Sequence, residues 1–146
     1  MKKLLFALLP VFISTASASP LPAKADVLAA NTVVAEYIGT QHIPCRFMTV
    51  DCPDRCDHAS DVAQFRVISN EKYVCNSEYG DEKEGPGSVM LVEARKAVPG
   101  QDDAAVHKLL GELKPGDKVR MTVTHYYVEH NGVQEPVRPV TEIARD

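Results

Sequence analysis

The chain has 146 residues, of which 20 are acidic and 16 are basic, so its formal net charge at pH 7 is -4. Nucleic-acid binding relies on clustered Lys and Arg side chains that displace counterions, and the sequence contains no such cluster. The composition therefore argues against a nucleic-acid partner. The length suits one ordinary domain with a single hydrophobic core.

The first residues have the three parts of a secretory signal peptide. Lys2 and Lys3 supply the positive charge, residues 4–13 form an apolar run, and small residues follow. The run is much shorter than the ~20 residues of a membrane-spanning helix. We therefore expect an exported protein, periplasmic or secreted, with no membrane anchor in its mature form. Removing residues 1–18 leaves 14 basic and 20 acidic residues, which changes the net charge from -4 to -6.

Two A-x-A cleavage sites compete, at residues 16–18 and at residues 23–25. The first lies at the more usual distance from the apolar run, which favours cleavage before Ser19. Pro and Ala are frequent in the next segment, so residues 19–30 are predicted to be a flexible leader. Residues 31–146 are then the single domain.

Three strands are predicted in the first part of this domain. Residues 32–38 are β-branched and aromatic, and Gly39 follows them. Residues 63–68 alternate between apolar and polar side chains, and this strand can continue to Val74. Residues 88–93 form a nearly continuous apolar run, which predicts a strand buried on both faces.

One helix follows the third predicted strand. Its apolar residues recur at helical spacing and share one face; they are Val106, Leu109, Leu110 and Leu113. Asp102 or Asp103 is expected to cap its beginning, since a side-chain oxygen there can accept from free backbone N–H groups. Lys114-Pro115-Gly116 ends it.

Two further strands close the predicted order. Residues 118–128 alternate, with Val119, Met121 and Val123 on one face. Asn131-Gly132 is typical of a two-residue hairpin turn, and residues 136–143 return as the last strand. The prolines of that strand cannot donate to a neighbouring strand, so it should lie partly at an edge or contain a bulge.

The single helix between the third and fourth of five strands discriminates among small β folds. This order predicts a mainly β protein with one helix, a five-stranded OB-fold-like Greek-key barrel. A small α+β sandwich is the alternative. An immunoglobulin-like sandwich would need about seven strands and no helix.

The stretch Leu113-Lys114-Pro115-Gly116-Asp117-Lys118-Val119-Arg120-Met121, followed by the Asn131-Gly132 hairpin, resembles the closing part of small secreted bacterial OB-fold proteins. That family is known for periplasmic stress-associated members, and the resemblance covers roughly residues 88–143. A second, local stretch from Ile38 to Cys45 is similar to the cysteine-bearing segment of a copper-responsive envelope-stress lipoprotein. The resemblances imply a fold and a compartment, and neither supplies a residue-level site.

A cysteine and histidine cluster lies in the loop between the first two predicted strands. It consists of Cys45, Cys52, Cys56 and His58, with Cys75 further along the chain. In an OB-fold this loop and the loop that carries His130 flank the same ligand-binding face. Thiolates and imidazoles are ligands for copper or zinc, so these four loop residues and His130 are candidate metal ligands. Their spacing matches no established zinc pattern.

Two disulfides are the other interpretation, and the oxidising compartment favours it. We expect Cys52 to pair with Cys56 and Cys45 with Cys75, although four cysteines allow three pairings. Each bond would stabilise the fold by ~2–4 kcal/mol. No cofactor is then needed, and copper or zinc belongs to the first interpretation.

Tyr126 and Tyr127 are neighbours on a predicted strand, so one should face the core and the other should lie outside as a candidate binding face. His125 shares strand parity with Val123, which suits a core or barrel-mouth residue. No catalytic motif is present, and we predict no enzyme. The sequence predicts an exported, disulfide-stapled binding module for a small molecule, a saccharide or an envelope protein. The alternative is a metal-handling or redox protein that uses the Cys/His loop.

Overall fold

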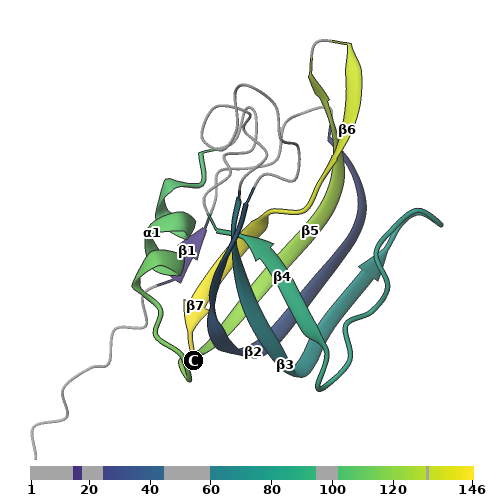
Figure 1. Ribbon diagram of the computed structural model, residues 1–146. Coiled ribbons are helices and arrows are strands. Elements are labelled where there is room, and N and C mark those ends of the chain that lie inside the picture. The colour runs from purple at the N-terminus through teal and green to yellow at the C-terminus, as the bar shows by residue number, and fades with distance from the viewer. Residues whose placement is uncertain (1–14, 18–24, 45–59, 95–101, 131) are drawn as a thin grey trace, which may run out of the picture.

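The structure, a computed structural model, describes residues 15–17, 25–44, 60–94, 102–130 and 132–146, apart from the side chains of residues 130, 133 and 135. Its elements are β1 (Thr15–Ser17), β2 (Asp26–Ile43), β3 (Ser60–Cys75), β4 (Val89–Glu93), α1 (Ala104–Glu112), β5 (Lys118–His130), β6 (Val133–Val137) and β7 (Val140–Arg145). The strands form one antiparallel sheet in the order β1-β7-β5-β2-β3-β4, and β6 pairs with β5 (Figure 1).

The prediction of a mainly β protein with one helix is confirmed for the described residues, and α1 lies between β4 and β5 as expected. The sheet has seven strands where five were predicted, and it is open: β4 does not pair with β7. The predicted last strand is divided into β6 and β7 at Arg138 and Pro139, because Pro139 has no N–H to donate to a ladder. Its carbonyl instead accepts from the Thr124 N–H at 3.1 Å.

The two longest strands, β2 and β3, curve through the whole sheet (Figure 1). β2 begins at Asp26, so the end of the segment predicted as a flexible leader is in fact strand. It pairs with β5 from Asp26, opposite Tyr127, to Glu36, opposite Lys118. Three register shifts along its pairing with β3 bend the sheet around the core.

The core fills the concave side of this sheet and is covered by α1 (Figure 1). Its members include the inward-facing residues of β2, β3 and β5 and the apolar face of α1: Val33, Ala35, Phe65, Val67, Val119, Met121, Val106 and Leu110. The predicted inner face of β5 and the apolar face of the helix are therefore confirmed. In the described part of the chain, no helix has the length and apolarity to cross a membrane.

The turn between α1 and β5 is fastened to β2 at Tyr37. The N–H of Gly116 donates to the Tyr37 carbonyl at 2.9 Å, and the Tyr37 N–H donates to the Asp117 carbonyl at 2.8 Å. Gly116 has a φ of 94°, a conformation that favours glycine. The Asp117 carboxylate accepts from the Lys114 N–H and from Arg145, and these bonds lower the pKa of Asp117. The turn therefore fixes α1 beside Tyr37.

β4 is an edge strand, which corrects the prediction of a strand buried on both faces. Met90 is 7% exposed and faces the core, whereas Val89 and Leu91 are 50% and 65% exposed. Nothing in the described residues covers the outer side of β4, so the apolar run alternates between core and solvent.

Candidate functional site

The predicted cysteine loop lies outside the described residues, since Cys45, Cys52, Cys56 and His58 fall within residues 45–59. Cys75 is described: it ends β3 as an exposed free thiol, and its S–H donates to the Ser77 carbonyl at 3.2 Å. The described residues contain no group of three or more His, Cys, Asp or Glu side chains arranged to hold a metal ion. The disulfide pairing and the metal site both stay predictions.

Cys75 and the beginning of the cysteine loop lie at opposite ends of β3. Ser60 pairs with Ile43, at the end of β2 that leads into the loop, whereas Cys75 pairs with Ala29. A disulfide needs Cα atoms within about 7 Å of each other, so the described strands lend no support to a bond between Cys45 and Cys75. His130 ends β5 in the hairpin opposite Val133.

The two predicted tyrosines have different environments. Tyr126 is 0% exposed and packs with Val128 in a small cluster of its own. Burial, and then the charge of Asp103, raises the pKa of Tyr126. Tyr127 is half-buried and lies edge-on to His125, with ring centroids 6.3 Å apart. Only Tyr127 is therefore placed to contribute to an exposed face.

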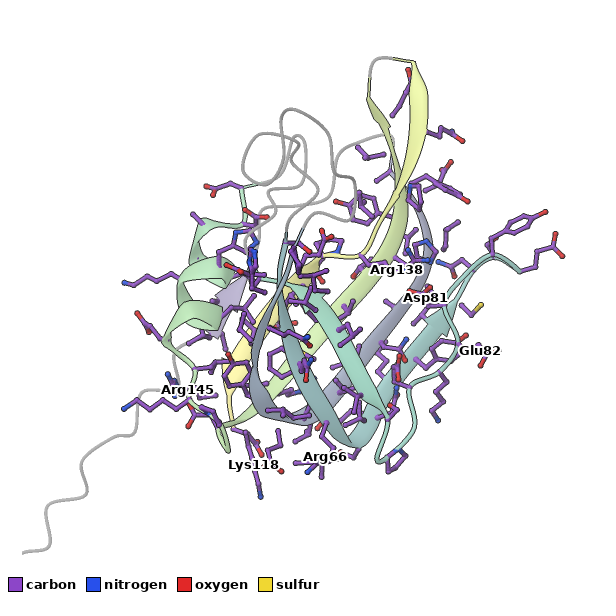
Figure 2. The ribbon with its side chains drawn as sticks, in the orientation of Figure 1. Arg66, Asp81, Glu82, Lys118, Arg138 and Arg145 are labelled. Carbon is purple, nitrogen blue, oxygen red and sulfur yellow. The ribbon has the colours of Figure 1, made fainter. Side chains whose placement is uncertain are left out.

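His125 lies on the inner side of β5 under the connection between β3 and β4, residues 76–88. Gly80 packs so tightly on β2 that an added Cβ would lie 2.8 Å from the Leu28 carbonyl oxygen. This contact brings Asp81 to Arg138, whose Nε donates to both carboxylate oxygens at 3.0 and 2.9 Å (Figure 2). Asp81 Oδ1 also lies 3.1 Å from His125 Nδ1.

His125 is only 4% exposed, yet neither ring nitrogen has a hydrogen-bond partner among the described residues, because its contact with Asp81 is not aligned as a hydrogen bond. Burial lowers the pKa of His125, the Asp81 carboxylate opposes this shift, and Arg138 adds to it. The imidazole is therefore stabilised in its neutral form.

An apolar patch occupies the outer face of β3 and β4. It consists of Ile68, Val89 and Leu91, which are three of the four large hydrophobic side chains that the described residues expose; Tyr79, in the connection between β3 and β4, is the fourth. Arg66 pairs with Val89 across the two strands and has no ion-pair partner within the described ranges. Exposed apolar patches of this kind mark interaction surfaces.

The patch lies along an open edge of the sheet. The Ser88 carbonyl accepts from Val67 on β3, and the Ala94 N–H donates to Asp61. Because backbone groups alternate in direction along an antiparallel strand, those of Val89 and Leu91 point away from β3. They have no backbone partner in the described part of the chain, since β4 pairs only with β3 there. Among the described residues, Val89 and Leu91 therefore have both unpaired backbone N–H and C=O groups at the sheet edge and exposed apolar side chains.

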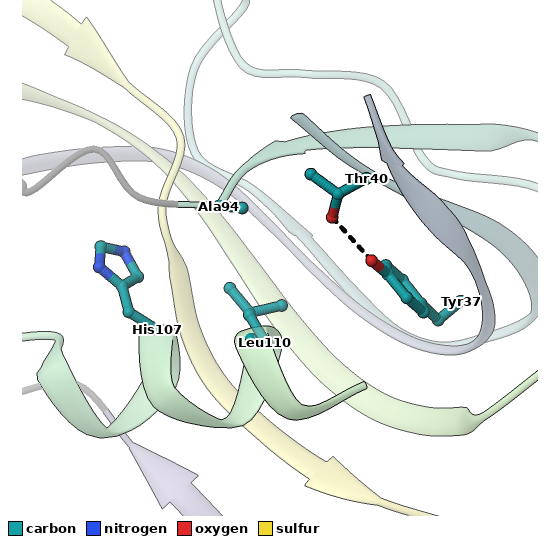
Figure 3. Close-up of a pocket in the computed structure, with 6 residues that line it drawn as sticks. Tyr37, Thr40, Ala94, His107 and Leu110 are labelled. Carbon is teal, nitrogen blue, oxygen red and sulfur yellow. Dashed lines mark hydrogen bonds between the residues drawn. The ribbon is translucent and has the colours of Figure 1, made fainter. Parts of the chain in front are cut away.

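A separate pocket lies between α1 and the inner side of β2 (Figure 3). Its lining residues are Tyr37, Thr40, Ala94, His107, Leu110 and Gly111, and its volume is about 340 Å³. The hydroxyl groups of Tyr37 and Thr40 are hydrogen-bonded to each other at 2.7 Å. His107 Nε2 faces Asp103 Oδ2 at 3.3 Å.

Sequence reasoning missed both the apolar patch and the pocket. The patch was hidden because an apolar run such as Val89–Glu93 looks the same in an edge strand and in a buried one. The pocket joins β2, the end of β4 and α1, and apart from the glycine within the helix, Gly111, no local feature signals such a combination.

The comparisons with known proteins add no relative. A scan against protein-family models gave no match, and searches of the curated proteins and of the solved structures gave none either.

Proposed function

We propose that the protein is an exported binding module of OB-like architecture, and that the outer face of β3 and β4 binds an extended polypeptide segment of an envelope protein. One observation carries this proposal: Val89 and Leu91 combine exposed apolar side chains with open backbone groups at a sheet edge.

The order of the strands supports the OB-like part of the proposal. Four of the strands that line the core lie in the order β5-β2-β3-β4, in which the fourth of them along the chain returns beside the first. That is the order of a Greek key. The helix between the third and fourth of these strands also suits an OB-type barrel, which is partly open and binds ligands across its second and third strands. Here those strands are β3 and β4.

The chemistry of the patch favours a polypeptide over the other predicted partners. The large exposed side chains on this face are aliphatic, whereas saccharides and nucleic-acid bases are commonly held on aromatic rings. An added strand would pair with the backbone of β4 while its alternate side chains cover Val89 and Leu91, as in other complexes formed by strand addition. Arg66 beside Val89 would favour an acidic residue in the partner.

Selection from a displayed library of random peptides tests this proposal. The exported protein should enrich peptides with alternating apolar side chains, and Leu91→Asp should weaken their binding at least tenfold. Tyr79→Asp is the matched control, since it places the same charge on another exposed apolar residue outside the patch. Circular dichroism checks that both variants fold. The proposal would be contradicted if the selected peptides bound the Leu91→Asp variant as tightly as the original protein. It would also be contradicted if the selection gave no peptide whose binding depends on Leu91.

The export part has its own test. N-terminal sequencing of the protein from a periplasmic fraction should begin at Ser19. Cleavage there removes β1, which pairs with β7 at residues 15–17. Protein that stays in the cytoplasm with Met1 intact would contradict export.

A further inference from the structure

The pocket between α1 and β2 lies apart from the outer face of β3 and β4, because Tyr37 is an inward-facing core residue. We propose that this pocket is a second binding site, for a small, uncharged, hydroxylated molecule about the size of a monosaccharide. Its volume of about 340 Å³ is at the lower end of the range for ligand sites, ~300–1,000 Å³, which limits the ligand to a small molecule.

The polar groups of the lining lie on two opposite elements. On β2, Tyr37 and Thr40 bond to each other, and since each hydroxyl has one proton, the pair keeps one O–H donor and free lone pairs for a ligand. On α1, the imidazole of His107 reaches the pocket (Figure 3). Leu110 and Ala94 give apolar surface between them. A molecule with hydroxyl groups on its rim and C–H groups on its faces complements both kinds of surface.

Gly111 supplies an independent observation. It lies within α1, where glycine is less favourable than alanine because it loses more backbone conformational entropy. A Cβ added there would meet no atom within 4 Å, and its backbone does not have a positive φ, so neither space nor conformation requires glycine. What the missing side chain provides is open volume, because Gly111 is part of the pocket lining. We infer that Gly111 keeps the pocket open for a ligand.

Asp103 determines which charge the site rejects. Asp103 is 7% exposed, and its Oδ2 has no aligned hydrogen-bond donor among the described residues. Oδ2 faces His107, which lines the pocket. A negative charge this close to the site repels an anionic ligand.

A titration followed by NMR tests the proposal on the exported protein, with D-glucose and D-glucuronate as probes that share one ring and differ by a carboxylate. D-glucose should shift the amide signals of residues 37, 40, 107 and 111 in a saturable way, and D-glucuronate should bind at least tenfold more weakly. Gly111→Leu should raise the Kd for D-glucose at least tenfold by filling the pocket, and Gly111→Ala should raise it by a smaller factor because its single methyl group fills less of the pocket.

Thr40→Val is the second variant, since it removes one hydroxyl and nearly keeps the shape of the side chain. It should raise the Kd about tenfold through the lost hydrogen bond. The assignment of the site is overturned if D-glucose causes no saturable shift at these amides, or if the affinity is unchanged in both Gly111→Leu and Thr40→Val. Equal affinity for the two sugars would overturn the restriction to uncharged molecules. None of these results depends on peptide binding at β4.

Discussion

The outer face of the sheet has two halves. In one, polar side chains form hydrogen bonds with one another; in the other, apolar side chains are exposed to solvent. On the half formed by β2, β5 and the end of β3 that carries Glu71, polar groups bond to one another across strands: Thr32 and Thr122 share a hydrogen bond of 3.0 Å, and Arg120 donates to Glu71 at 2.6 Å. On the half formed by β3 and β4, Ile68, Val89 and Leu91 are exposed to solvent.

The difference shows which part of the outer face is stabilised by its own contacts and which part is free to bind another molecule. Both halves share one core, so the contrast cannot come from folding requirements on the inner side. Cross-strand polar pairs stabilise the first half without a partner. The exposed apolar residues of the second half gain their stabilisation only when another molecule covers them.

The largest effect should separate the two sides of β4. Met90→Ala should lower the free energy of unfolding by about 2–5 kcal/mol, because it leaves a cavity in the core. Leu91→Ala should change it by less than about 0.5 kcal/mol, because this neighbouring side chain faces solvent. Urea denaturation of the two variants measures the difference. Similar losses for both would show that the outer face of β4 is covered in the free protein.

A smaller effect should come from His125, on the inner side of β5, one of the strands that form the polar half of the outer face. Burial holds the pKa of His125 below its ordinary value of 6.5, so the unfolded chain binds this proton more readily than the folded protein does. Stability contributed by the neutral imidazole is complete above pH 6.5 and is lost as the pH falls through 6.5 towards the lowered pKa. The free energy of unfolding should therefore decrease between pH 7.5 and 5.5.

His125→Gln should flatten this dependence, since glutamine does not titrate. Urea titrations at pH 7.5, 6.5 and 5.5 measure both proteins, and the range stops there because carboxylates add their own effect at lower pH. An equally steep dependence in the variant would assign the effect to other groups.

The smallest effect should come from the cross-strand hydroxyl pair. Thr122→Val should cost about 1 kcal/mol, because it removes the hydrogen bond to the buried hydroxyl of Thr32. Changing both residues to Val should cost less than the sum of the two single changes, since no hydroxyl is then left without its partner. Additive losses would show that the two hydroxyls act independently and would weaken the contrast between the halves.

Much of the fold could be predicted because its signals are local. Val119, Met121 and Val123 alternate with polar neighbours, and the helix spacing of Val106 and Leu110 marks a buried face; the structure confirms both patterns. The beginning of β2 could not be predicted, because residues 26–30 include two alanines and an aspartate, which do not favour a strand, and the segment becomes strand through its pairing with β5 and β3. Sheet closure depends on contacts between distant strands, which no local pattern reports.

The site was harder to predict for the same reason. The sequence directs attention to cysteines, because their chemistry is conspicuous in any context. Val89 and Leu91 of β4 are exposed because no further strand of the described residues pairs with β4. The pocket exists because α1 lies over Tyr37. Gly111 was the one feature of the sequence that could have indicated the pocket, because a glycine within a helix usually has a packing or functional reason.

Gly80 has a consequence for how this sequence can diverge. Because a Cβ there would lie 2.8 Å from the backbone of Leu28, any other residue would push the connection between β3 and β4 off β2 and carry Asp81 away from Arg138. The neighbouring Tyr79 is exposed and free to vary. In distant relatives that keep this connection, we expect glycine at position 80 to be retained while the residues around it change. This glycine would then help to align chains that share few other residues.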